Sequence, residues 1–281
     1  MRALVALALA VSALVAGCSS QALLADALAA QGQDEEDDLQ LAREASAFYL
    51  KLSESVLREQ PGHSALAGAV AGGFTQYAYA FVAFEAERLE NQNLKAALLQ
   101  RQRAERLYAR AQAHALRALE TQQAGFAKAL AAGVPALKPE QVGLAYWGAA
   151  AWAARISLVK DRPEIVADLP LALNLAQAAW QRQPGWGSGD LASLMGTLEA
   201  ARPGGSAAQA AQYFERAQTL AAGRKAGVFV ARAEALAGQD RAAFEALLHQ
   251  ALAVAAQHPN LANAVMRERA QWLLDTLDER F

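Results

Sequence analysis

Alanine and leucine recur at intervals of three and four residues through most of this chain, and apolar and polar residues do not alternate as they would in a strand. β-Branched residues are few, and only 8 of the 281 residues are proline. Alanine and leucine are strong helix formers, and the small alanine side chain lets two helices pack closely. The sequence therefore predicts an all-α fold.

Glycine and proline residues divide this helical pattern into segments. Because both residues end helices, we expect short turns at them and antiparallel helical hairpins between them. A short helix at 21–30 is expected to precede the main series. The expected series is 38–60, 64–91, 94–120, 126–130, 142–159, 171–183, 190–201, 206–222, 226–237, 241–257 and 261–278.

Local signals mark one further helix start and refine two of these helices. Asp161 and Glu164 fit a capping pair, and Asp190 or Ser188 is predicted to cap the helix after the glycine-rich loop at 185–189. The helix at 38–60 carries an apolar line at helical spacing. That line consists of Leu41, Ala45, Phe48, Leu52 and Val56.

Three glycines lie within the expected helix at 64–91. Gly68, Gly72 and Gly73 each weaken a helix by roughly 1 kcal/mol relative to alanine. We expect a neighbouring helix to approach closely at these positions.

One spacing of residues repeats along the chain. It resembles the second helix of a tetratricopeptide repeat, although the period is 38 and then 37 residues and the first-helix pattern is mostly missing. We expect an array of antiparallel hairpins resembling degenerate tetratricopeptide repeats, and an irregular bundle is the alternative. The copies are Ala172, Ala176, Ala179 and Pro184; Ala210, Phe214, Ala217 and Ala222; Leu247, Ala251, Val254 and Pro259; and, in part, Ala104, Tyr108 and Ala111.

The N-terminus has the three parts of a secretory signal: a basic Arg2, an apolar core over 3–16, and small residues before Cys18. A cysteine directly after Gly17 resembles the bacterial lipobox, in which the thiol is acylated. We therefore expect a signal peptide at 1–17, a lipidated tether at 18–38 and a single domain at 39–281. Ser19, rather than aspartate, favours the outer membrane over the inner one.

Several functional classes lack support. A net charge of −2 gives no basic face for nucleic acid, and Cys18 is the only cysteine, so no disulfide is expected. The scattered histidines, His63, His114, His249 and His258, show no metal-ligand spacing, and surface or capping roles are expected for them. We find no catalytic constellation and infer no cofactor and no enzyme.

Aromatic residues gather in two places. Tyr146, Trp147 and Trp152 lie on the apolar helix at 142–159, while Trp186 lies in the glycine-rich loop. Core packing and an aromatic-lined groove both remain open.

Six segments together resemble a known family. They are 38–45 (DLQLAREA), 73–82 (GFTQYAYAFV), 145–152 (AYWGAAAW), 157–161 (SLVKD), 201–205 (ARPGG) and 269–274 (RAQWLL). In this order they resemble the T-component of tripartite ATP-independent periplasmic (TRAP) transporters, the TatT-like lipoproteins. The resemblance spans nearly the whole mature chain.

The resemblance implies a periplasmic lipoprotein of cryptic tetratricopeptide-like hairpins. It implies a homotrimer that associates with the substrate-binding P-component, with a channel-like cavity in each protomer for an organic or hydrophobic ligand. The expected walls and polar contacts of that cavity are Tyr146, Trp147, Trp152, Trp186, Lys160 and Arg202. Capping and helix-end charge are the alternative roles for Lys160 and Arg202.

The function expected from the sequence is therefore a lipid-anchored accessory component of a TRAP-type uptake transporter. A tetratricopeptide-like scaffold lipoprotein for envelope or outer-membrane assembly is the alternative. An envelope enzyme is a third possibility, and it would require a convergent set of buried ionisable residues in a cleft.

Overall fold

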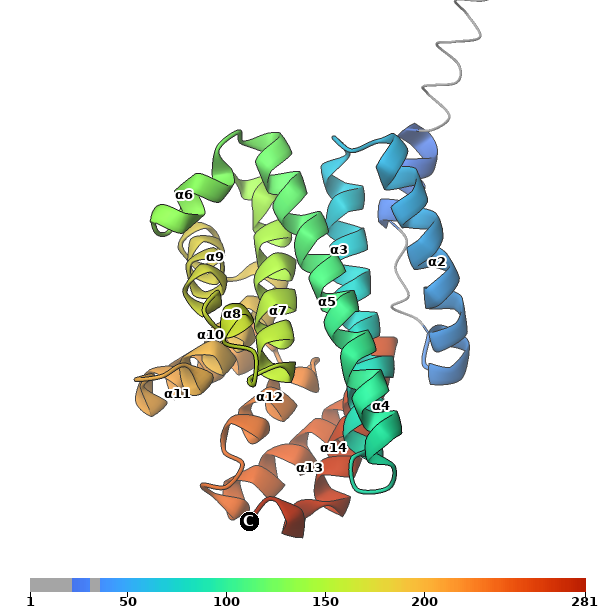
Figure 1. Cartoon of the computed structure of the whole chain (residues 1–281). Coiled ribbons are helices and arrows are strands. Elements are labelled where there is room, and N and C mark those ends of the chain that lie inside the picture. Colours follow the sequence, from blue (N-terminus) through green and yellow to red (C-terminus); the bar gives the residue numbers. More distant parts are fainter. Residues whose placement is uncertain (1–21, 31–35) are drawn as a thin grey trace, which may run out of the picture.

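The computed structural model describes residues 22–30 and 36–281, and within these ranges the secondary structure is helical throughout, which confirms the all-α prediction. Cys18 and the predicted signal peptide at 1–17 lie outside the described residues. A short helix at 22–30 precedes the labelled elements (Figure 1). These are α2 (Leu39–Glu59), α3 (Ser64–Ala78), the π-helix η1 (Tyr79–Ala83), α4 (Phe84–Leu89), α5 (Leu94–Gln122), α6 (Phe126–Ala132), η2 (Pro139–Gln141), α7 (Val142–Leu158), α8 (Pro163–Val166), α9 (Leu169–Arg182), η3 (Trp186–Gly189), α10 (Asp190–Ala201), α11 (Ala207–Ala221), α12 (Gly227–Ala235), α13 (Arg241–Gln257), α14 (Leu261–Asp275) and η4 (Leu277–Glu279).

Helices that follow one another along the chain lie side by side. α2, α3, α5, α7 and α9 pack in that order, α10 packs on α11, and α13 packs on α12 and α14 (Figure 1). One apolar core runs from the helix at 22–30 to α10, and a second lies among α12, α13 and α14. Most of the longer helices therefore pack against the helix that precedes or follows them in the chain.

The repeated spacing falls on helices that pack against the helix before them. Its first three positions lie on α5, α9, α11 and α13, and all of these residues are buried except the half-buried Val254. Small residues at these positions let neighbouring helices approach. The buried residues are Ala104, Tyr108, Ala111, Ala172, Ala176, Ala179, Ala210, Phe214, Ala217, Leu247 and Ala251.

Two of the predicted helix caps are wrong. α8 is preceded by Arg162, which makes no side-chain capping bond, so Asp161 and Glu164 do not form a capping pair. α10 is capped by Gly189, because its φ of +105° and the Ala217 carbonyl oxygen, 2.5 Å from where a Cβ would lie, exclude a side chain. Asp190 is instead the first helical residue.

The apolar line on α2 is packed only in part: Leu52 and Val56 lie against the main core, and Leu41 and Phe48 face outward. Leu41 is 53% exposed and Phe48 is 67% exposed, whereas the opposite face of α2 buries Ala42, Leu50 and Leu57. The packed face also carries Glu54, which is buried among cations described below. The helix at 38–60 is thus confirmed, but only part of its most regular apolar line is packed.

The close approach predicted for the glycines of α3 occurs at two of the three. Gly72 lies against the indole of Trp147 and Gly73 against the side chain of Leu50, whereas no atom comes within 4 Å of a Cβ placed at Gly68. Within the described part of the chain, none of the helices combines the length and apolarity needed to cross a bilayer.

Candidate functional site

Three of the predicted aromatic residues form one cluster. Tyr146 and Trp147 come from the first half of α7 and Trp186 from η3, and the ring centroids of Tyr146 and Trp186 are 4.4 Å apart. The rings of Tyr146 and Trp147 are 4.8 Å apart, and all three residues are half-buried. Gly143 lies beside the Trp186 ring, with its would-be Cβ 3.4 Å from Cζ2. The cluster therefore presents partly exposed aromatic surface on a rigid helix.

A half-buried ion pair borders this cluster. Lys225 Nζ donates to Asp190 Oδ2 at 2.8 Å and to the Gly187 carbonyl oxygen at 2.6 Å. Burial raises the pKa of Asp190, and Lys225 offsets part of that rise. Burial also raises the pKa of Tyr146, and the nearby Asp190 charge adds to the effect. The cluster thus combines apolar rings with a neutral phenol and a paired carboxylate, which suits binding rather than acid–base chemistry.

The other three predicted site residues lie elsewhere. Trp152 is buried in the main core, and its indole N–H has no hydrogen-bond partner among the described residues. Lys160 is exposed in the turn after α7. Arg202 follows α10 and donates two hydrogen bonds of 2.8 Å to Glu199, which is the helix-end role given as its alternative. The structure does not bring these residues to the aromatic cluster.

A cleft that the sequence did not indicate lies at the start of α2. It has a volume of about 360 Å³ and is formed by α2, η1, α4 and α14. Its lining includes two largely buried aromatic residues, Phe81 and Phe84, and two cations, Arg43 and Arg88. The lining residues are Leu39, Gln40, Arg43, Glu44, Ala80, Phe81, Phe84, Glu85, Arg88, Val265 and Glu268.

Guanidinium groups and aromatic rings alternate from this cleft into the C-terminal hairpin. Arg88 lies 4.1 Å from the Phe84 ring centroid, and Arg269 lies 5.0 Å from it on α14. Arg269 also lies 4.9 Å from the Trp272 ring, which Arg280 approaches at 4.6 Å. Such cation–π contacts are worth about 0.5–2 kcal/mol each, depending on how far they are desolvated. The series ties α4 to α14.

Arg269 is the centre of this contact. Its side chain is only 8% exposed, and its Nη1 donates to Glu87 at 2.6 Å while Nη2 donates to Glu234 at 2.6 Å. Burial by itself would lower the pKa of Arg269, but Glu234, Tyr79 and Glu87 together raise it. Arg269 therefore stays charged and joins α4, α12 and α14.

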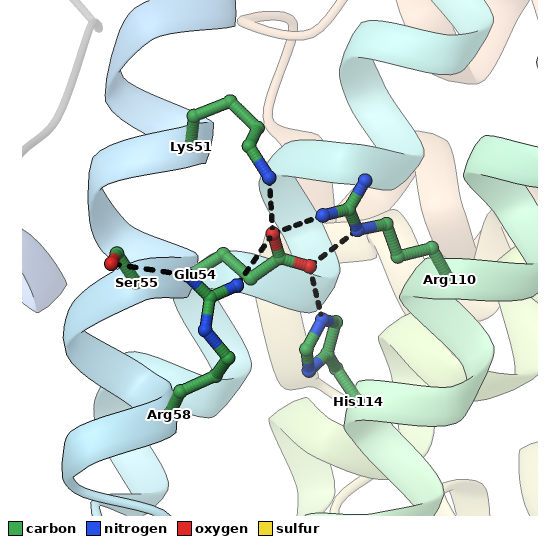
Figure 2. A network of polar contacts seen from close by, with 6 residues as sticks. All are labelled: Lys51, Glu54, Ser55, Arg58, Arg110 and His114. Atoms are coloured by element: carbon green, nitrogen blue, oxygen red, sulfur yellow. Dashed lines mark hydrogen bonds and ion pairs between the residues drawn. The ribbon is translucent and has the colours of Figure 1, made fainter.

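A second ion network joins α2 to α5. Figure 2 shows Lys51, Arg58, Arg110 and His114 converging on Glu54, whose side chain is only 5% exposed. Lys51 donates to Glu54 at 2.9 Å, and His114 Nε2 lies 2.9 Å from Glu54 Oε1. Arg110 donates from Nε and Nη2 to the two oxygens of the carboxylate. His114 also stacks on Phe74, with ring centroids 6.2 Å apart.

Burial by itself would raise the pKa of Glu54, but the hydrogen bonds from Arg110, Lys51 and His114 lower it to about 2. Burial lowers the pKa of His114, although the hydrogen bond and the charge of Glu54 act to raise it. Glu54 lies on α2, and Arg110 and His114 lie on α5, so the network holds these two helices together. His114 is buried rather than at the surface, while His63 caps α3 as expected. Among the described residues, no group of His, Cys, Asp and Glu could hold a metal ion.

Comparison with known proteins identifies relatives. A family model described as TAtT, the TRAP transporter T-component, matches residues 35–281. A protein of Treponema pallidum (strain Nichols), described as "Uncharacterized protein", is 26% identical over 255 residues, covering 85% of this chain and 79% of that protein. The family match covers the aromatic cluster, the cleft and the apolar cores from α2 onward, but not the helix at 22–30.

Proposed function

This chain belongs to the TRAP transporter T-component family, and from that premise we propose that it is a lipid-anchored accessory component that docks the substrate-binding P-component of a TRAP uptake system. The match over residues 35–281 is the observation that carries the proposal. The family is a transporter component rather than a family of enzymes. The proposed role is therefore docking, with the guidance of an organic or hydrophobic ligand as part of it.

The N-terminal pattern supports the anchored part of the proposal. Residues 1–17 fit a signal peptide and Cys18 fits the acylated position of a lipobox. Anchoring there would hold residues 39–281 on the periplasmic side of a membrane. Because Ser19 rather than aspartate follows Cys18, we propose the outer membrane. We propose a homotrimer as the assembled form, as the family resemblance implies.

The aromatic cluster is the surface that we propose for the P-component. Partly exposed tyrosine and tryptophan are the residues most enriched at energetically important interface positions. Tyr146, Trp147 and Trp186 also have a fixed geometry, since glycines accept two of the rings and Lys225 holds the adjoining loop. Lys160 and Arg202 would contribute only at the rim of such an interface.

Binding of the cognate P-component to the mature chain carrying Cys18→Ala tests the docking role. Calorimetry should show binding with or without ligand, and Trp186→Ala should weaken it at least about tenfold, as expected for an interface hot spot. Phe48→Ala is the matched control, since Phe48 is an exposed aromatic residue on α2 outside the cluster. Absence of binding in both ligand states would overturn the docking role, and equal weakening by both variants would overturn its assignment to the cluster.

The buried positions of the repeated spacing favour a second candidate. They support a degenerate tetratricopeptide-like array, which would also suit a scaffold lipoprotein in envelope or outer-membrane assembly. The identity of the bound partner separates the two functions. Capture of the P-component favours the transporter role, whereas an assembly protein bound in its place would favour the scaffold.

A further inference from the structure

The helix at 22–30 is docked on the body of the protein. Ala25 is fully buried and Leu28 nearly so, and both belong to the main apolar core. Asp26 Oδ1 lies 3.0 Å from Nε2 of His63, and His63 in turn caps the start of α3. The helix therefore has a fixed place beside the turn between α2 and α3.

The proposed lipid site is close to this helix along the chain. Cys18 precedes residue 22 by only four residues, and a fully extended chain spans at most about 3.6 Å per residue. The Cα atom of Cys18 is therefore within about 14 Å of the start of the docked helix. A lipid on Cys18 would bring that end of the body to the membrane surface.

The outer face of the same helix is apolar. Leu23 is 68% exposed and Leu24 is 44% exposed, and Asp26 is the only charged residue between 22 and 30. Exposed leucines on a short helix next to a lipid chain suit burial at the boundary between headgroups and acyl chains. The exposed apolar area and the short link to Cys18 favour a lipid surface over a protein partner here.

We propose that the helix at 22–30 is a membrane seat: Leu23 and Leu24 enter the bilayer interface, and Ala25 and Leu28 hold the body in a fixed orientation above it. This inference rests on the proposed lipidation of Cys18. It does not depend on the P-component, because the proposed binding partner of the helix is a phospholipid surface.

The seat places the cleft away from the membrane. α2 has 21 residues, which corresponds to about 31 Å at 1.5 Å per residue. Its first residues line the cleft, and its last residues lie next to the turn that holds His63 and the docked helix (Figure 1). A body seated at one end of α2 therefore presents the cleft at the other end, toward the periplasm.

Site-directed fluorescence on the lipidated full chain tests the seat. The thiol of Cys18 would be consumed by lipid, so Leu23→Cys and Phe48→Cys each provide a single reactive thiol, at positions exposed to 68% and 67%. The labelled proteins are bound to vesicles of phosphatidylethanolamine and phosphatidylglycerol (3:1) that carry a nitroxide quencher on the acyl chains. The label at 23 should be quenched at least about twofold more than the label at 48. Equal quenching would overturn the proposal.

A second pair of labels tests the fixed orientation. Glu59→Cys, at the same end as the docked helix, should be quenched more by headgroup nitroxides than Gln92→Cys, in the turn between α4 and α5. Adding Leu28→Ser should remove that difference while the thermal unfolding transition of the body remains, since Leu28 is the larger side chain that docks the helix. A difference that survives Leu28→Ser would overturn the docked seat.

Failure of the premise gives a different result. If Cys18 carries no lipid, the unmodified thiol reacts with the label and the chain does not sediment with vesicles, which overturns the seat together with the anchor. Binding of the P-component to the Cys18→Ala chain is measured without any membrane. Loss of that binding alone would overturn the docking function and leave the seat standing.

Discussion

The indole ring of Trp147 on α7 occupies the space that a side chain at Gly72 on α3 would need. A Cβ built on Gly72 would come within 2.7 Å of Cε2 and 2.8 Å of Nε1 of that ring. The ring is fixed between Gly72 and Tyr146, so it has little freedom to move aside. This contact links the core of the N-terminal hairpins to the aromatic cluster.

Gly72→Ala should therefore destabilise the protein. Inserting a methyl group into a packed contact costs about 1–3 kcal/mol, which exceeds the gain of about 1 kcal/mol in helix propensity. Gly68→Ala is the control on the same helix, where no atom lies within 4 Å of the added Cβ, and it should stabilise or leave stability unchanged. Urea unfolding of both variants measures the difference. Equal effects would contradict the close contact.

Glu54→Gln should lower stability at neutral pH and much less at acid pH. The folded pKa of Glu54 is about 2 against an ordinary 4.5, so its stabilisation is present above pH 4.5 and is lost as the pH falls toward 2. The loss at pH 7 should be about 3 kcal/mol, and it should shrink by more than half at pH 3. Unfolding free energies at both pH values test this, with Glu59→Gln, exposed on the same helix, as control.

Arg269→Met should strongly destabilise the C-terminal hairpins. It leaves Glu87 and Glu234 without their buried partner and removes the stacking on Phe84 and Trp272. Breaking one side of a buried ion pair costs about 3–5 kcal/mol. Arg241→Met, which breaks exposed pairs with Glu245 and Asp278, should barely shift the melting temperature. Calorimetric melting curves that show similar shifts would refute the distinction.

Cys18→Ala should release the protein from membranes without changing its fold. The sequence provides no second cysteine, and none of the described helices can span a bilayer. Membrane fractionation and circular dichroism test the two halves of this statement. A mutant that misfolds would show that Cys18 is structural and that the lipobox interpretation is wrong.

Local sequence signals predicted the helices more successfully than their caps. α10 and α13 begin and end where expected because glycine and proline act on the chain next to them. The cap of α10 was missed because its cause is distant: the Ala217 carbonyl on α11 leaves room only for glycine at 189. A contact between residues far apart in the sequence produces no local pattern, so it could not be predicted from the sequence around Gly189.

The candidate site, too, was predicted only in part. Tyr146 and Trp147 were predicted near Trp186 and lie beside it. Trp152 comes five residues after Trp147 and six after Tyr146, which places it about 140° and 240° around α7 from these two residues, respectively. Helical spacing could have separated Trp152 from this group. The cleft could not be predicted, because its lining comes from α2, η1, α4 and α14, and the single sequence does not indicate their contact.

The lining of that cleft depends on the number of residues in the π-helix η1. The N–H of Phe84 bonds to the carbonyl of Tyr79 five residues earlier, so the helical phase after η1 differs from that of an uninterrupted α-helix. Deleting one residue within η1 would restore ordinary α-helical pairing and rotate the following residues by about 100°. Phe84 and Arg88 would then leave the cleft together. A single codon lost within this segment would therefore remove the hollow while leaving the composition of its lining almost unchanged.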